Sequence, residues 1–349
     1  MKPSIKVRLS DVARLASAGR FAQAFDMLRG MPRAEPAPPR AAPRPVVRSY
    51  VPPTPARAPA GRAATNFGER TFVGAAGARA YKLYIPGAAA AAAPSTTFPL
   101  IVMLHGCTQS PDDFAAGTRM NDLAEEAGFF VAWPAQPSTA NASRCWNWFN
   151  AADQTRDRGE PSLIAGITRE VMRDFPIDPA RVYVAGLSAG GAAAAIMGAR
   201  YPDLYAAIGV HSGLACGAAR DLNSALAAMK SGGRADIKPA ARPMPTIIFH
   251  GDADSVVNPR NADQVAAQAA SSATLKRTIE EGRSAGGVGY TRAIEADRDG
   301  RPVLEQWTLH GAGHAWSGGS AAGSFTDPRG PDASRAMMRF FREHALQPA

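Results

Sequence analysis

Beyond residue 67, short apolar runs alternate with amphipathic stretches along the chain. Nearly continuous apolar runs predict buried strands, and apolar residues three or four positions apart predict helices. The predicted strands are 79–85, 99–104, 129–133, 181–185, 206–210 and 246–250. The predicted helices are 112–127, 162–174, 188–200, 260–270 and 331–343. This alternation predicts an α/β fold, a mostly parallel central sheet with helices on both faces, whose functional groups lie beyond the carboxyl ends of the strands.

The first 66 residues have a different pattern. Residues 9–29 carry apolar side chains at helical spacing, which predicts a short helical N-terminal segment over 1–31. Ten prolines between residues 32 and 59 predict a linker rich in Pro, Ala and Arg over 32–66. The α/β domain is then expected to occupy residues 67–349.

Charge separates the same two regions. Residues 1–70 hold 13 of the 39 Lys and Arg residues and 4 of the 30 Asp and Glu residues, so the remaining 279 residues hold 26 of each. The net charge of +9 therefore belongs to the N-terminal region, and the α/β domain does not require a nucleic-acid partner. No run of 18 apolar residues predicts a transmembrane segment, and three cysteines without zinc-ligand spacing predict no metal site.

The strongest chemical signal lies in residues 182–191, Val-Tyr-Val-Ala-Gly-Leu-Ser-Ala-Gly-Gly. They contain G-x-S-x-G between an apolar strand and an alanine-rich helix, a context typical of a nucleophile elbow. Glycines allow the sharp turn, and the helix N-terminus favours negative charge developing beside the serine. Ser188 is therefore the predicted nucleophile.

A serine hydroxyl needs a base, and on this architecture an acid and a histidine follow the serine in that order. The strand 246–250 runs into a turn with two carboxylates, Asp252 and Asp254. Asp254, further beyond the strand, is the predicted acid, whereas Asp252 is placed to bracket the turn. A late glycine-rich loop carries two histidines. We predict His314 as the base and a packing role for His310.

The strand 99–104 is followed by a His-Gly pair and a polar loop that begins at Cys107. On this architecture, that loop and the residue after the nucleophile each supply one backbone N–H to an oxyanion hole. The predicted donors are the amides of Cys107 and Ala189. His105 and His250 each precede a glycine at a strand end and are predicted to be structural.

Taken together, these segments resemble the polyhydroxybutyrate (PHB) depolymerase-type esterase family. The matching motifs are residues 104–109, 145–149, 186–191, 211–213, 250–254 and 313–316, in the order expected. The resemblance implies an α/β-hydrolase fold, hydrolysis of carboxylic esters through an acyl-enzyme, and no cofactor. Its relatives include esterases of feruloyl and acetyl groups on plant polysaccharides, and members are commonly exported.

The aromatic residues and cysteines near these motifs leave alternatives open. Trp146, Trp148 and Trp316 either line a substrate cleft, for which Trp316 is the best candidate, or pack in the core. Cys107 and Cys145 could form a disulfide that ties the aromatic loop to the oxyanion loop.

We therefore expect a serine esterase acting on short-chain polyhydroxyalkanoate (polyhydroxybutyrate) or its oligomers. A feruloyl or acetyl esterase is the second interpretation, and a non-catalytic polyester-granule-binding protein is the alternative of another class. Residues 1–65 are a candidate for attachment to a surface or granule. The N-terminal sequence has no recognisable secretory signal, which predicts a cytoplasmic protein, whereas the family resemblance favours an extracellular one.

Overall fold

The structure is a computed structural model that describes residues 66–233, 244–270 and 275–347. The predicted helical segment 1–31 and all but the last residue of the predicted linker 32–66 lie outside these residues.

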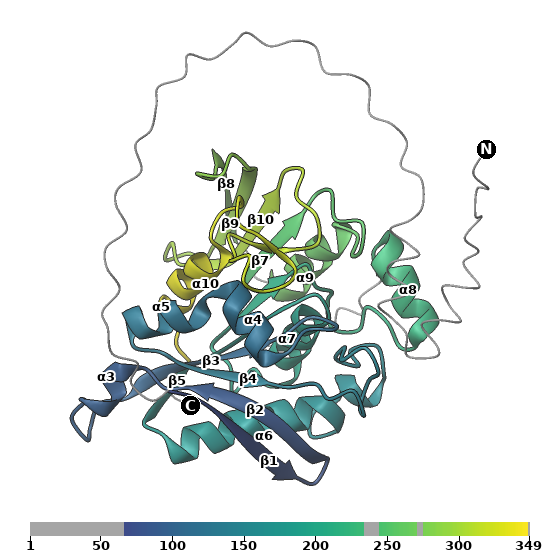
Figure 1. Cartoon of the computed structure of the whole chain (residues 1–349). Coiled ribbons are helices and arrows are strands. Elements are labelled where there is room, and N and C mark those ends of the chain that lie inside the picture. The colour runs from purple at the N-terminus through teal and green to yellow at the C-terminus, as the bar shows by residue number, and fades with distance from the viewer. Residues whose placement is uncertain (1–65, 234–243, 271–274, 348–349) are drawn as a thin grey trace, which may run out of the picture.

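Within them, ten strands form one sheet in the order β1-β2-β4-β3-β5-β6-β7-β10-β9-β8 (Figure 1). The central strands from β4 to β10 run parallel, whereas β1 and β2 at one end and β9 and β8 at the other are antiparallel. The strands are β1 (Phe67–Gly74), β2 (Gly77–Tyr84), β3 (Phe98–Leu104), β4 (Phe130–Pro134), β5 (Ile177–Leu187), β6 (Ala207–His211), β7 (Thr246–Gly251), β8 (Lys276–Arg283), β9 (Gly289–Ala296) and β10 (Pro302–Leu309). A second, two-stranded sheet pairs β11 (Trp316–Ser317) with β12 (Thr326–Asp327).

Helices cover both faces of the large sheet. Side chains alternate between the two faces along each central strand, and both sets are apolar, so each face is buried under helices. In β3, Leu100 and Val102 enter one core together with α6, α7 and α9, whereas Ile101 and Met103 enter a second core with α4, α5 and α10 (Figure 1). The helices are α3 (Gly87–Ala90), α4 (Pro111–Thr118), α5 (Met120–Ala127), α6 (Gly159–Asp174), α7 (Ala189–Arg200), α8 (Leu222–Ser231), α9 (Arg260–Ala270) and α10 (Ala333–Arg342), with a 3-10 turn η1 (Ala152–Gln154). The predicted α/β class and its covered, mostly parallel sheet are confirmed.

The predicted helix 112–127 is two helices, α4 and α5, separated at Arg119, whose φ is 53°. Late residues bind the end of α4: the Ser320 amide donates to the carbonyl of Gly117 at 2.7 Å, and the Ser334 hydroxyl donates to that of Thr118 at 2.7 Å. The break is therefore stabilised by tertiary contacts that the local pattern does not contain.

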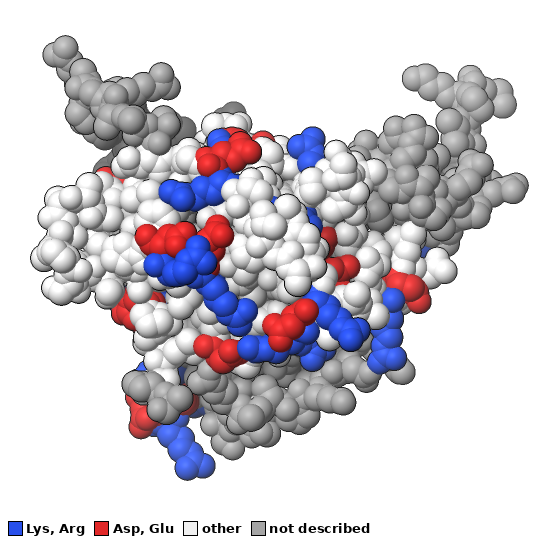
Figure 2. All heavy atoms as spheres, turned by 90° about the horizontal axis from the view of Figure 1, so that it is seen from below, with Lys and Arg blue, Asp and Glu red and all other residues white. Residues whose placement is uncertain are grey.

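The exterior of the described chain carries charges of both signs. On the face that bears α6 and β1, Figure 2 shows basic and acidic side chains close to one another, without a large area of one sign. This arrangement agrees with the even charge balance of the sequence beyond residue 70. No helix in the described ranges is long and apolar enough to cross a bilayer.

Candidate active site

Ser188 forms the turn between β5 and α7. Its backbone has φ 58° and ψ −118°, a positive-φ conformation that costs a non-glycine residue about 1–3 kcal/mol. The turn is closely packed: a Cβ on Gly190 would collide with the carbonyl oxygen of Leu104, and one on Gly186 would collide with the backbone of Gly190. Close backbone approach therefore requires both glycines of the G-x-S-x-G pattern.

The carboxyl ends of neighbouring strands bring the other predicted residues to the same edge of the sheet. Leu187 at the end of β5 is in register with His211 at the end of β6, and His211 with Phe249 in β7. Leu309 at the end of β10 is in register with Gly251 at the end of β7. The loops that follow β5, β7 and β10 therefore start side by side.

Asp254 and His314 form a hydrogen-bonded pair within these loops. Oδ2 of Asp254 lies 2.8 Å from Nδ1 of His314, and Oδ1 accepts the backbone N–H groups of Val256 and Val257, each at 2.9 Å. Burial raises the pKa of Asp254, but His314, His250 and the backbone donors outweigh it and lower that pKa below its ordinary value. An ionised Asp254 accepts the Nδ1 proton and leaves Nε2 of His314 available as a base.

Asp252 and His310 form a second, more exposed pair. Oδ2 of Asp252 lies 3.0 Å from Nδ1 of His310, and Oδ1 accepts the backbone N–H of Gly311 at 2.7 Å. Asp252 thus holds the loop that carries His314, as the predicted bracketing role requires. The predicted packing role of His310 is wrong, because its side chain is 48% exposed and its Nε2 lies 3.0 Å from the hydroxyl of Thr291.

The oxyanion loop, residues 105–109, follows β3 and passes close to the elbow. A Cβ built on Gly106 would lie 3.7 Å from the Cβ of Ser188. Within the described part of the chain, the amides of Cys107 and Ala189 have no hydrogen-bond acceptor. Two unpaired N–H groups beside a serine are the arrangement that a developing oxyanion needs.

The side chain of Gln109 supports this loop from within. Its Oε1 accepts the Gly106 amide at 2.9 Å, and its Nε2 donates to Asp113 at 2.8 Å and to the carbonyl of Ser324 at 3.1 Å. Ser324 in turn donates to Asp113 through its amide, at 2.9 Å, and through its hydroxyl, at 2.6 Å. The oxyanion loop is therefore fastened to a segment 215 residues later in the chain.

A disulfide joins Cys107 in the oxyanion loop to Cys145, which precedes the aromatic residues 146–149. Cys216, the third cysteine, is a buried free thiol, and burial raises its pKa. The disulfide places the aromatic segment next to the oxyanion loop.

Three further histidines are buried beneath the site. Burial lowers the pKa of His105 to about 4 and that of His211 to about 3, and it also lowers the pKa of His250. Nε2 of His105 accepts the amide of Gln136 at 3.1 Å, and Nε2 of His211 accepts the amide of Ser317 at 3.0 Å. These neutral rings bridge backbone segments, so the structural role expected of His105 fits its surroundings. His250, whose Nε2 lies 2.9 Å from the carbonyl of Val257, is equally enclosed.

A narrow apolar pocket opens beside Ser188. It leaves about 20 Å³ for the centres of water-sized molecules, room for one or two of them. It is lined by Cys107, Cys145, Trp148, Phe149, Ser188, Ala189, Leu214, Leu222, Ala225, Leu226, Met229 and Val257. The apolar lining suits a short hydrocarbon group attached to a carbonyl that faces the oxyanion loop.

Two of the three tryptophans proposed for the cleft do not reach it. Trp146 is 0% exposed and donates from Nε1 to the carbonyl of His105, and Trp316 is 1% exposed and donates to the hydroxyl of Ser334. Trp316 also stacks on His211, with ring centroids 5.1 Å apart. The expectation that Trp146 and Trp316 bind substrate is therefore corrected to core packing, whereas Trp148 lines the pocket.

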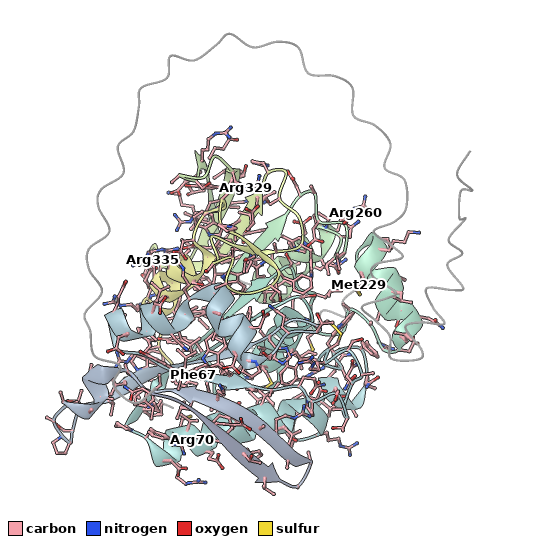
Figure 3. The ribbon with its side chains drawn as sticks, in the orientation of Figure 1. Phe67, Arg70, Met229, Arg260, Arg329 and Arg335 are labelled. Carbon is pink, nitrogen blue, oxygen red and sulfur yellow. A yellow bond between two sulfur atoms is a disulfide. The ribbon has the colours of Figure 1, made fainter. Side chains whose placement is uncertain are left out.

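Helix α8 supplies a wall of the pocket that the sequence analysis missed. Leu222, Ala225, Leu226 and Met229 all face it, and Figure 3 shows Met229 on the side of α8 that faces the rest of the described chain. These residues follow the i, i+3, i+4, i+7 spacing of an amphipathic helix, so the pattern was available in the sequence.

The relatives found by comparison with known proteins are named as esterases and depolymerases. Residues 79–292 match the family model described as Esterase PHB depolymerase. The chain is 33% identical over 230 residues to poly(3-hydroxyalkanoate) depolymerase C of Paucimonas lemoignei, which covers 62% of this chain and 54% of that protein. It is 28% identical over 275 residues to probable acetylxylan esterase A of Aspergillus clavatus, covering 67% of this chain and 85% of that protein. It is also 35% identical over 117 residues to feruloyl esterase B of Neurospora crassa, covering 33% and 39%. The chain thus spans about half the length of the depolymerase.

Solved structures share the fold. An acetyl xylan esterase from Aspergillus awamori superposes with a TM-score of 0.59 at 19% identity, over 79% of this chain and 99% of that one. An S-formylglutathione hydrolase from Agrobacterium tumefaciens superposes with a TM-score of 0.51 at 15% identity, over 81% and 97%. The arrangement of sheet and helices is therefore that of the α/β-hydrolase esterases.

Proposed function

The chain belongs to the PHB depolymerase-type esterase family, and from this premise we propose that it is a serine esterase that hydrolyses short-chain carboxylic esters through an acyl-enzyme. The observation that carries the proposal is the 2.8 Å hydrogen bond between Asp254 and His314, on loops that start at the same sheet edge as Ser188. In this proposal Ser188 is the nucleophile, His314 the base and Asp254 the residue that orients the base.

In the first half-reaction, Oγ of Ser188 attacks the ester carbonyl carbon and its proton passes to Nε2 of His314. The carbonyl oxygen becomes an oxyanion and accepts the amides of Cys107 and Ala189. The bond to the alcohol oxygen then breaks, and the alcohol leaves with the proton from His314. In the second half-reaction, His314 takes a proton from water, the resulting nucleophile attacks the acyl-enzyme, and Ser188 recovers its proton as the carboxylic acid leaves.

The pocket beside Ser188 supports a substrate with a short acyl group, the part of the ester that derives from the carboxylic acid. The alcohol must lie next to His314, because that ring protonates it, and His314 is not among the pocket's lining residues. The acyl group is therefore proposed to enter the pocket, whose narrow apolar space favours a short acyl group over a feruloyl ring. A hydroxybutyryl or acetyl group is favoured over ferulate on this ground alone, because the relatives are named for poly(3-hydroxyalkanoate), for acetylxylan and for feruloyl esters.

Soluble oligomers are favoured over solid polymer as the substrate of the described domain. Its exposed large hydrophobic side chains are Val73 on β1 and Ile279 on β8, which lie in strands at opposite ends of the sheet. Adsorption to an apolar solid requires a contiguous apolar patch, and two separated side chains do not form one. Attachment to granules through residues 1–65 stays a prediction, because those residues lie outside the described ranges.

The Cys107–Cys145 disulfide supports the extracellular interpretation over the cytoplasmic one. Stable disulfides form in oxidising compartments and are rare in the cytosol. Here the disulfide links two segments that line the pocket. We therefore propose an oxidising compartment, and we expect reductant to lower the activity.

The test of the nucleophile is Ser188→Ala, with Ser162→Ala on α6 as the matched control. We expect a loss of about 10⁴- to 10⁶-fold in kcat on p-nitrophenyl acetate for Ser188→Ala and no loss for Ser162→Ala. A serine-directed phosphonate should label the wild type and not the Ser188 variant. Activity within tenfold of the wild type would remove Ser188 from the mechanism, and an unlabelled wild type would favour the non-catalytic alternative.

The test of the acyl group compares p-nitrophenyl acetate, butyrate and octanoate with methyl ferulate and hydroxybutyrate oligomers. We expect kcat/KM to fall beyond butyrate, and Met229→Ala to recover the longer chain by about tenfold, since one or two methylene groups in a pocket change binding by about 1–3 kcal/mol. Faster release of ferulate than of hydroxybutyrate would support the feruloyl esterase instead.

A further inference from the structure

Glu160 is a buried carboxylate that the proposed mechanism does not use. It is the second residue of α6 and is 6% exposed. A buried carboxylate is unfavourable unless hydrogen-bond donors compensate it. The N–H groups that donate to Glu160 belong to Gln136 and Asn147, which follow β4 in the chain.

The carboxylate accepts N–H groups from these two residues. Oε2 accepts the Asn147 amide at 2.7 Å, and Oε1 accepts Nδ2 of Asn147 at 2.7 Å and Nε2 of Gln136. The same Gln136 side chain donates to the carbonyl of Cys145 at 2.9 Å and accepts from Arg79. Glu160 therefore holds both ends of residues 136–147, which we call the clamp segment.

The clamp segment in turn holds the oxyanion loop through covalent and hydrogen-bonded links. They are the Cys107–Cys145 disulfide and three hydrogen bonds. The bonds run from Thr108 N to Ser143 O at 2.7 Å, from Gln136 N to His105 Nε2 at 3.1 Å, and from Trp146 Nε1 to His105 O at 3.1 Å. The amide of Cys107 lies between these attachments. Its direction therefore depends on where the clamp segment lies.

We propose that Glu160 is a positioning residue: its ionised carboxylate fixes the clamp segment, which aims the Cys107 amide at the substrate carbonyl beside Ser188. This inference rests on the proposed function, since it assigns Glu160 a part in stabilising the oxyanion. Because its three donors cannot accept a hydrogen bond, a protonated Glu160 would place an O–H against an N–H. The clamp segment loses a support when Glu160 takes up a proton, so activity depends on the ionisation of Glu160 as well as on that of the base.

Burial and the charged groups around Glu160 place this ionisation near neutral pH. Burial and the neighbouring carboxylate of Asp153 raise the pKa of Glu160 to about 7, against the opposing effect of the Asn147 and Gln136 donors and of Arg79. Asp153 lies on η1 and accepts the Glu160 amide at 2.8 Å, and Arg79 lies on β2. His105 is neutral over this range, because burial lowers its pKa to about 4.

The experiment measures kcat/KM against pH on p-nitrophenyl acetate for the wild type, Glu160→Gln and the control Glu170→Gln. Glu170 lies on the same helix and accepts the hydroxyl of Tyr81 at 2.8 Å, away from the clamp segment. In the wild type two groups must lose a proton, so the acid limb should approach a slope of about 2 in log units. Glu160→Gln should reduce the slope to about 1 and lower kcat about tenfold at pH 8, with KM within about threefold, less than the 10²–10³ lost with a whole oxyanion donor. Glu170→Gln should keep the wild-type slope.

A second variant covers the case in which Glu160→Gln does not fold. Asn147→Ala removes one side-chain donor to Glu160 and keeps the backbone donor, so it should lower kcat in the same direction by a smaller factor. A wild-type acid limb with a slope of 1, or a Glu160→Gln enzyme with unchanged slope and kcat, overturns the positioning role. If either of these results is found and Ser188→Ala still abolishes activity, only the positioning role of Glu160 fails. If Ser188→Ala is active, the proposed function itself is overturned.

Discussion

Asp254 and Glu160 are each 6% exposed, and they have opposite ionisation behaviour. Burial opposes ionisation of both, but Asp254 faces two histidines and two backbone amides, and its pKa is lowered. Glu160 accepts three N–H groups and still has a raised pKa, because burial opposes its ionisation and Asp153 adds a negative charge nearby. The number of hydrogen bonds therefore does not decide the charge of a buried carboxylate here. The neighbouring groups differ instead: a carboxylate adds to the effect of burial at Glu160, whereas histidines and backbone donors oppose it at Asp254.

The difference separates two tasks in one site. In the proposed mechanism Asp254 orients the base, a role that requires it to stay ionised throughout the working pH range, and its lowered pKa agrees with that role. In the inference above, ionised Glu160 fixes the clamp segment, and uptake of one proton by Glu160 removes that support. Three predictions test whether the two carboxylates differ in this way.

The largest expected effect is on the Asp254 side. Asp254→Asn should lower kcat about 10⁴-fold, because an amide no longer sets the tautomer of His314. Asp252→Asn, the matched control two residues earlier, should stay within about tenfold, because Asp252 only holds the loop through Gly311 and His310. Kinetics of both purified variants, with circular dichroism to check folding, make the comparison. A larger loss of kcat in Asp252→Asn than in Asp254→Asn would assign the orientation of His314 to Asp252 and the loop-holding role to Asp254.

A third buried carboxylate, Glu305, lies away from the site and serves as a control for the comparison of Asp254 with Glu160. Glu305 on β10 is 0% exposed and pairs with Arg292 at 2.8 Å and Arg339 at 2.6 Å. Glu305→Gln removes the charge that both arginines share, but Arg292 keeps Glu280 and Arg339 keeps Glu343 as partners. The substitution should therefore lower the free energy of unfolding by about 1–3 kcal/mol. Urea unfolding measures that loss, and kcat of the folded variant should equal that of the wild type. A large fall in kcat would mean that any buried carboxylate of this fold affects catalysis.

The last prediction concerns the pH dependence of stability. The pKa of Glu160 is raised in the folded chain, so its contribution is fully present below about pH 4.5 and is lost as the pH rises through about 7. The unfolding free energy of the wild type, relative to Glu160→Gln, should therefore fall by on the order of 3 kcal/mol between pH 4.5 and 7.5. Asp254 has a lowered pKa, so its contribution is lost only below its ordinary range, at more acidic pH. Denaturant titrations from pH 4.5 to 7.5 measure this free energy. If the unfolding free energy of the wild type, relative to Glu160→Gln, rises with pH, the comparison is contradicted.

The sequence predicted β2 and the parallel strands β3 to β7, because buried parallel strands are apolar throughout, and it predicted the elbow, whose glycines are locally required. It did not predict the parallel strand β10. It did not predict β8, whose residues Lys276–Arg283 are mostly charged or polar and exposed on both faces. Trp316 was misplaced, because an aromatic residue beside a predicted base looks the same whether it faces a cleft or a core. Glu160 was missed, since a glutamate in the first turn of a helix is ordinary in sequence, and its partners Gln136 and Asn147 meet it only through tertiary contacts.

The link from Gln109 to Ser324 also has a consequence for the order in which the molecule becomes active. The strands that carry Ser188, Asp254 and the oxyanion loop can pair before residue 324 has been synthesised, but the hydrogen bond that steadies the loop joins residues 215 apart in the chain. Contacts of such long sequence separation form late in folding. During synthesis or refolding, the sheet should therefore assemble first and ester hydrolysis appear afterwards, which leaves the nascent chain inactive until its C-terminal segment has docked.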